Sequence, residues 1–113
     1  MTFSKDLTAD EAYDAAAEMD FQIADCGVAA AKAIEEGDME KAIEDLQTIL
    51  ELNRSMKEAA EIGEHKEWVE YANALADHVK ETLQAIEDGR EWDAFGGAKE
   101  IPELSKLYLG RRQ

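Results

Sequence analysis

The feature that most constrains the fold is residues 9–36, a run without proline that has the periodicity of an α-helix. When the run is wound at about 100° per residue, its apolar side chains form two rows roughly a third of a turn apart. The first row consists of Ala12, Ala16, Met19, Ile23, Cys26, Ala30 and Ala33. The second row consists of Tyr13, Ala17, Phe21, Ala24, Val28 and Ala31. A helix that is apolar on two sides should contact two neighbours, either two helices of a bundle or one helix and another chain.

Capping signals and glycines delimit two further helices. Thr8 and Glu11 have the spacing of a capping box, so the first helix should begin at residue 9 and end before Gly37. Asp38 is placed to cap a second helix at once, which predicts a tight turn between two antiparallel helices. We expect helices over residues 9–36, 39–62 and 64–88. Asn53 falls in the inner row of the second helix, where it either fixes the register through a hydrogen bond or lies near water at the end of the bundle.

The last quarter of the chain is expected to form only short helices. Residues 90–95 are long enough for one or two turns, Gly96 and Gly97 should end that helix, and Pro102 should start another. We therefore expect short helices over residues 90–95 and 102–109 that fold back over the bundle. The prediction is a single all-α domain of residues 1–113. Its architecture is an antiparallel three-helix bundle, up-down-up, completed by a short C-terminal segment as a partial fourth helix.

The charge balance restricts the kinds of partner. Among 113 residues, 27 Asp and Glu stand against 12 Lys and Arg, so the formal net charge is −15. This balance argues against direct binding to nucleic acid or to an anionic membrane, because both require a cationic surface. It favours basic protein partners. The 45% content of apolar residues and the helical periodicity argue against disorder, whereas adaptation to high salt stays open as another source of acidity.

The cell compartment is inferred from the cysteine and from hydropathy. Cys26 is the single cysteine and lies in an apolar row, so we interpret it as a small buried hydrophobic residue. A reactive thiol or an intermolecular disulfide is the alternative. The first residues lack the apolar segment of a signal peptide, and no run approaches the ~18 residues of a membrane span. We expect a cytoplasmic protein.

No motif in the sequence predicts catalysis. The chain has no nucleophile elbow and no glycine-rich phosphate loop, so we expect no enzyme activity and no cofactor. A di-iron site would require Glu-x-x-His pairs, and none occurs. Glu61 and His65 are four residues apart and His78 precedes Glu81 by three, but the two histidines face different directions around their helix. A metal- or cofactor-carrying bundle is therefore the third alternative, and no metal ligands are assigned.

Charge placement on the helices is more informative. No acidic residue is followed four residues later by a basic one, the arrangement that stabilises a helix by about 0.2–0.5 kcal/mol. Acids instead follow acids, as in Asp14 and Glu18, and the first helix has no base before Lys32. The later helices offer weaker arrangements, either three residues apart or with the base first: Glu51 with Arg54, Lys66 with Glu70, and Asp77 with Lys80. Retained repulsion in the first helix suggests that the charge has a use.

Two functional hypotheses follow from this pattern. Carboxylates three or four residues apart on one helix face stand about 5–6 Å from each other, close to the spacing of successive phosphates along a nucleic-acid strand. The leading hypothesis is a non-enzymatic inhibitor or nucleic-acid mimic that engages a basic surface of a nucleic-acid-handling protein. Its contact residues would be Glu11, Asp14, Glu18, Asp25, Glu40 and Glu44.

The alternative is a structural or adaptor bundle, in which the charge only maintains solubility. It would form a homodimer or dock a partner helix through the second apolar row of the first helix. The residues of that interface would be Tyr13, Phe21, Ala24 and Val28.

Overall fold

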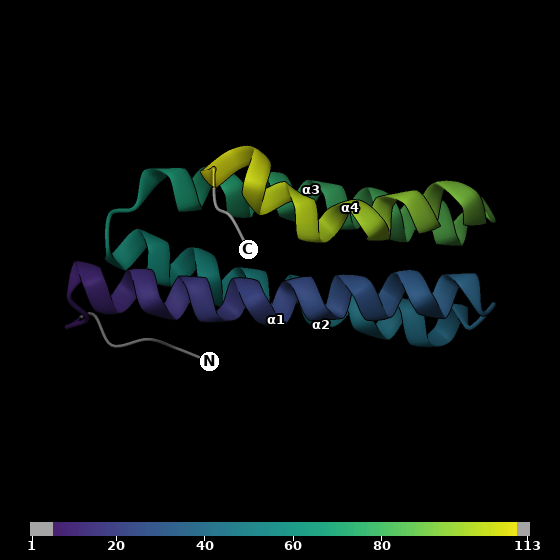
Figure 1. Cartoon of the computed structure of the whole chain (residues 1–113), viewed down its shortest axis with the longest axis horizontal. Coiled ribbons are helices and arrows are strands. Elements are labelled where there is room, and N and C mark those ends of the chain that lie inside the picture. The colour runs from purple at the N-terminus through teal and green to yellow at the C-terminus, as the bar shows by residue number, and fades with distance from the viewer. Residues whose placement is uncertain (1–5, 111–113) are drawn as a thin grey trace.

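A computed structural model of the chain describes residues 6–110, which form four α-helices and no strand. Helix α1 spans Ala9–Glu35, α2 spans Met39–Ile62, α3 spans Lys66–Glu87 and α4 spans Glu91–Leu109. Consecutive helices are antiparallel, with α1 and α2 in one layer and α3 and α4 in the other (Figure 1). Each helix packs along two others, since α1 contacts α2 and α4, and α3 contacts the same two. The prediction of an all-helical chain is confirmed.

The helix ends follow from local hydrogen bonds. The Thr8 hydroxyl accepts the backbone N–H of Glu11 at 3.1 Å, and the Glu11 carboxylate accepts that of Thr8 at 3.0 Å, which completes a capping box. Asp38 caps α2 by accepting the N–H of Lys41 at 3.1 Å. Gly37 takes a φ of 80°, the left-handed conformation in which the absence of Cβ removes the steric penalty. These contacts set the tight turn between α1 and α2.

Helix α4 differs from the expectation of two short helices over residues 90–95 and 102–109. It is continuous over 19 residues, so the bundle has a full fourth helix in place of a partial one. Gly97 lies against α3, where an added Cβ would come within 2.5 Å of Thr82 Oγ1, so the glycine permits close packing and does not end the helix. Pro102 cannot donate to the Ala98 carbonyl, yet the helix continues through it. The tertiary contacts of α4 outweigh its weak local propensity.

Large side chains from all four helices fill the space between the layers, and many small alanines of α1 and α2 lie at the helix contacts. The largest fully buried apolar and aromatic side chains are Trp68, Tyr71, Ile23, Leu46, Ile49, Met56, Leu75, Ile101 and Val79. Asn53 is also buried, and its Nδ2 donates to the Ala72 carbonyl of α3 at 2.8 Å. Of the two roles open to Asn53, the structure therefore supports the hydrogen bond between helices.

None of the helices in the described part of the chain combines the length and the apolarity that a membrane crossing requires. Residues 1–5, which contributed to the expectation that the chain has no signal peptide, lie outside the described residues.

Candidate functional site

The six predicted contact carboxylates are all exposed on the layer formed by α1 and α2. We call them the acidic row: Glu11, Asp14, Glu18, Asp25, Glu40 and Glu44. At 1.5 Å per residue, the part of the row on α1 extends over about 21 Å along the helix. Asp20, on the opposite side of α1, is buried and does not belong to it. Asp20 is thus the one buried carboxylate of α1.

The acidic row is extended along the molecule. Because α1 and α2 are antiparallel, Glu40 and Glu44 lie near the Gly37 turn, whereas Glu11 lies at the opposite end of the rod (Figure 1). The molecule measures 44 × 26 × 19 Å, so the row follows its longest dimension. The structure thus brings the six carboxylates onto one layer but not into a single cluster.

The carboxylates of the acidic row are not neutralised by neighbouring cations. Among the ion pairs formed by residues 6–110, none includes a member of the row. Lys41, the cation nearest in sequence to Glu40 and Glu44, instead binds Asp45 at 2.7 Å. Backbone and hydroxyl hydrogen bonds from Thr8 lower the pKa of Glu11, so this carboxylate stays ionised at neutral pH. The row therefore presents exposed carboxylates that no ion pair within residues 6–110 engages.

The second apolar row of α1 divides into two parts. Tyr13 is 40% exposed and contacts Trp68 and His65 edge to face, with ring centroids 5.5 and 5.6 Å away, so it belongs to an aromatic cluster within the molecule. Phe21 and Val28 are 52% and 60% exposed. Ala24 lies between them in the row and is half-buried. An apolar strip of two large side chains thus remains on the surface of α1.

Residue Cys26 is half-buried beside the core, close to the role expected for it. Burial, followed by the charges of Asp45 and Asp25, raises the pKa of its thiol. The thiol is therefore protonated at neutral pH, which makes it a weak nucleophile.

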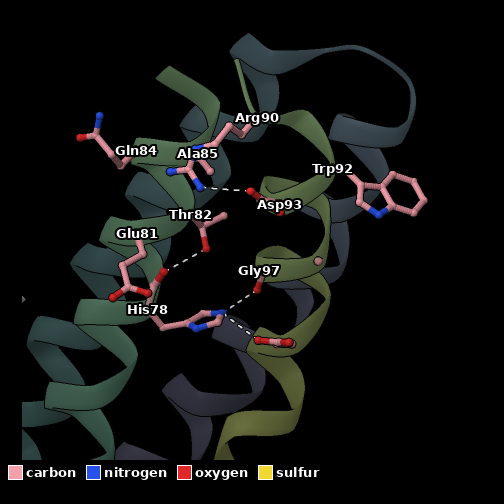
Figure 2. Close-up of a pocket in the computed structure, with 11 residues that line it drawn as sticks. His78, Glu81, Thr82, Gln84, Ala85, Arg90, Trp92, Asp93 and Gly97 are labelled. Atoms are coloured by element: carbon pink, nitrogen blue, oxygen red, sulfur yellow. Dashed lines mark hydrogen bonds and ion pairs between the residues drawn. The ribbon is translucent and has the colours of Figure 1, made fainter. Parts of the chain in front are cut away.

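A cleft of about 610 Å³, which no sequence pattern predicted, lies between α3 and α4 (Figure 2). His78 projects from α3 toward α4, and its Nε2 lies 2.7 Å from the Gly97 carbonyl and 3.9 Å from a carboxylate oxygen of Glu100. Since a carbonyl only accepts, Nε2 carries the proton in this contact. The pairing of Gly97 with His78 depends on which helices are neighbours, and no local spacing in the sequence encodes it.

The main polar groups of this cleft are already occupied by the protein. Thr82 donates its hydroxyl proton to the His78 carbonyl at 2.9 Å, and Arg90 binds Asp93 and Asp88 at 3.1 and 3.3 Å. These two carboxylates raise the pKa of Arg90. Across residues 6–110, no group of three His, Cys, Asp or Glu side chains has an arrangement suited to a metal ion. The cleft contacts thus hold α3 against α4.

Comparisons of the chain with protein-family models, with curated proteins and with solved structures give no match.

Proposed function

We propose that the protein is a non-enzymatic binding protein that uses the acidic row to engage a basic surface on a nucleic-acid-handling partner, as an inhibitor or nucleic-acid mimic. The observation that carries the proposal is the exposure of six carboxylates without an ion-pair partner among the described residues. Lys41, which follows Glu40 on α2, and Arg90 do form ion pairs, but with carboxylates outside the row. The acidic row is thus available to cations supplied by another molecule.

The rigidity of α1 supports this use of its charge. The helix is 27 residues long and packs against two other helices, so its carboxylates are held in line before any partner arrives. A preformed surface loses less conformational entropy on binding than a flexible acidic tail does. Complementary charge also increases the association rate and disfavours acidic competitors.

Apolar side chains beside the acidic row would add affinity. Phe21 follows Glu18 by three residues and Val28 follows Asp25 by three, so each exposed apolar side chain neighbours a carboxylate on the helix surface. Burial of these two side chains by the partner would contribute about 25 cal/mol for each Å² of apolar surface removed from water. Charge would then increase the rate of association with the partner, and apolar contact would stabilise the bound complex.

The test neutralises three carboxylates of α1 together, as Asp14→Asn, Glu18→Gln and Asp25→Asn. Partners captured at low ionic strength are identified, and the affinity of each purified partner is measured by calorimetry between about 50 and 200 mM salt. We expect the triple variant to bind at least about tenfold more weakly, a change of about 1.4 kcal/mol. Duplex DNA or RNA should compete with the wild-type protein for the partner.

The matched control changes the same amount of charge on α3, which lies in the other layer, as Glu70→Gln, Glu81→Gln and Glu87→Gln. Its affinity should stay close to that of the wild type. If both triple variants bind the partner equally weakly, the loss of affinity comes from net charge and not from the acidic row. Wild-type affinity in the α1 variant, or affinity independent of salt, would refute the proposal.

A second candidate function is favoured by the exposure of Phe21 and Val28: a structural or adaptor bundle that forms a homodimer through this strip. In that case Phe21→Asp should convert a dimer into a monomer in sedimentation equilibrium, while the helical circular dichroism is retained. The triple variant of the acidic row would leave the dimer intact. A wild-type protein that stays monomeric at all concentrations would exclude this candidate.

A further inference from the structure

The turn of residues 63–65 is the place where the described chain passes from the layer of α1 and α2 to the layer of α3 and α4 (Figure 1). The turns at Gly37 and Gly89 connect helices of the same layer. If the middle turn straightened, α2 and α3 would join into one long helix, and α3 and α4 would leave α1 and α2 together. A second copy of the chain could then restore every helix contact, which is the geometry of domain swapping.

The backbone of the middle turn is strained at Glu64. This residue has a φ of 57°, in the left-handed region where a side chain carries a steric penalty. The same position, one residue after the helix C-cap, is occupied by glycine in the other two turns, Gly37 with a φ of 80° and Gly89 with a φ of 76°. In the middle turn the glycine comes one residue earlier, at Gly63, which has an ordinary φ of −82°.

Local signals that separate two helices are also weak around this turn. His65 occupies the N-cap of α3 and forms no capping hydrogen bond through its side chain, whereas Asp38 caps α2. Residues 59–69 contain no proline and none of Ser, Thr, Asp or Asn, the residues that favour helix N-caps. Gly63 is the one residue in this stretch with a strongly unfavourable helix propensity.

The contacts between the two layers can form equally well within one chain or between two. Asn53 of α2 donates to the Ala72 carbonyl of α3, and Tyr71 of α3 donates to Asp20 of α1. In a swapped dimer each of these bonds would have the same two residues as partners, contributed by different copies. The packing between layers therefore contributes alike to both forms, and the balance between them depends on the turn and on the entropy of association.

We propose that the chain exchanges its α3–α4 hairpin with a second copy through residues 63–65, which gives a domain-swapped dimer with α2 and α3 of each chain in one continuous helix. Opening releases the strain at Glu64 and gives up the contact of His65 Nε2 with the Ala9 carbonyl, and high protein concentration favours the dimer by mass action. The dimer carries two acidic rows. It differs from a dimer through Phe21 and Val28, which would leave the turn closed, and it does not depend on the proposed partner binding.

The experiment measures how two substitutions in the turn shift the equilibrium in opposite directions. The full chain is unfolded in urea, refolded at protein concentrations between about 10 μM and 1 mM, incubated to equilibrium and analysed by size exclusion with light scattering. We expect a dimer whose fraction rises with concentration. Glu64→Gly should weaken dimerisation at least about tenfold, because glycine removes the strain and each dimer opens two turns.

The opposite substitution is Gly63→Ala. In the closed turn an added Cβ would lie 2.7 Å from Ala12 Cβ, whereas alanine favours a continuous helix over glycine. This variant should dimerise at least about tenfold more strongly than the wild type.

Two matched controls make the same chemical changes away from the middle turn. Glu36→Gly removes a glutamate from the first turn, where its φ is −83° and no strain is released. Gly96→Ala adds a methyl group to α4 at a position with no atom within 4 Å of the new Cβ. Both variants should dimerise as the wild type does, because neither change affects residues 63–65.

A distance within one chain identifies the swapped form. Spin labels are attached in a Cys26→Ala background through Gln47→Cys on α2 and Gln84→Cys on α3, both exposed positions. In the monomer the labels lie on neighbouring helices of a molecule that is 26 × 19 Å in cross-section. In a continuous helix they would be about 55 Å apart at 1.5 Å per residue. Dimers formed with excess unlabelled chain should show the long distance by pulsed dipolar spectroscopy.

Three results would overturn the proposal. The first is a wild-type chain that stays monomeric at every refolding concentration. The second is a dimer in which the labels keep the short distance of the monomer, as a dimer of closed chains would. The third is an equal effect of Glu64→Gly and Glu36→Gly on the dimer fraction.

Discussion

Individual polar side chains connect helices that are distant in the sequence. His65 Nε2 lies 2.8 Å from the Ala9 carbonyl at the start of α1, and His78 Nε2 lies 2.7 Å from the Gly97 carbonyl of α4. The His65 ring, at the N-cap of α3, and the His78 ring, within α3, therefore serve as N–H donors to another helix. The Tyr71 hydroxyl donates to Asp20 Oδ1 at 2.5 Å, which joins α3 to α1 through the core. These bonds fix the register in a core rich in small side chains.

The buried bond between Tyr71 and Asp20 gives a prediction at the residue scale. Tyr71→Phe removes the hydroxyl and leaves a buried carboxyl oxygen with one donor fewer. We expect the free energy of unfolding to fall by about 1–3 kcal/mol, as measured by urea denaturation. Tyr108→Phe is the control, because Tyr108 is 46% exposed and its hydroxyl can bond to water. Equal stability of the Tyr71→Phe and wild-type proteins would contradict a stabilising role for the bond.

Among the elements, α4 is the one that local sequence signals describe least well. Gly96, Gly97 and Pro102 each weaken a helix, yet the segment from Glu91 to Leu109 is helical throughout. Its contacts with α3 and α1 supply what its local propensity lacks. At Gly27 of α1, an added Cβ would lie 2.9 Å from Ile101, so a second glycine also permits α4 to pack closely.

The two adjacent glycines of α4 provide a matched pair of substitutions. An added Cβ at Gly96 has no atom within 4 Å, whereas at Gly97 it would lie 2.5 Å from Thr82 Oγ1 and 3.3 Å from Thr82 Cβ. Gly96→Ala should stabilise the protein by about 0.5–1 kcal/mol through helix propensity. Gly97→Ala should destabilise it by about 1–3 kcal/mol, because rotation of Thr82 alone does not clear the contact.

Chemical denaturation of these variants measures both changes. The loss from Gly97→Ala should shrink in a Thr82→Ala background, which removes the opposing hydroxyl and methyl groups. Equal changes in the free energy of unfolding from Gly96→Ala and Gly97→Ala would show that the close approach of α3 and α4 does not require glycine at position 97.

How much of the structure the sequence predicts depends on the range of the interaction. The capping box of Thr8 and Glu11 and the acidic row on α1 follow from spacings of three and four residues, which helical geometry fixes. The continuity of α4 and the contact of His78 with the Gly97 carbonyl depend on which helices become neighbours. Asn53 illustrates the limit, since periodicity placed it in the inner row but could not indicate Ala72 as its partner.

The charge of the whole molecule predicts opposite effects of salt on folding and on partner binding. With a net charge of −15, the folded state concentrates like charges that the unfolded chain holds farther apart. Screening by NaCl should therefore raise the melting temperature, and a gain of about 1 kcal/mol corresponds to about 4–8 °C for a domain near this size. The same screening should weaken capture of a basic partner.

Differential scanning calorimetry between low and moderate NaCl tests the effect on folding. The triple variant with Asp14→Asn, Glu18→Gln and Asp25→Asn should be more stable than the wild type at low salt and should gain less from added NaCl. A melting temperature that does not change with NaCl, or that decreases, would show that self-repulsion is not a significant part of the stability of this fold.

An even number of antiparallel helices places the start of α1 and the end of α4 at the same end of the rod, opposite the Gly37 and Gly89 turns (Figure 1). The four helices therefore form a cycle, and the chain is suited to circular permutation. A short linker between the two ends would allow the backbone to be opened at Gly37 or Gly89, where both glycines hold exposed left-handed turns. Each permutant would retain the same helix neighbours, so the order in which the helices are synthesised could be varied without changing which helices are in contact.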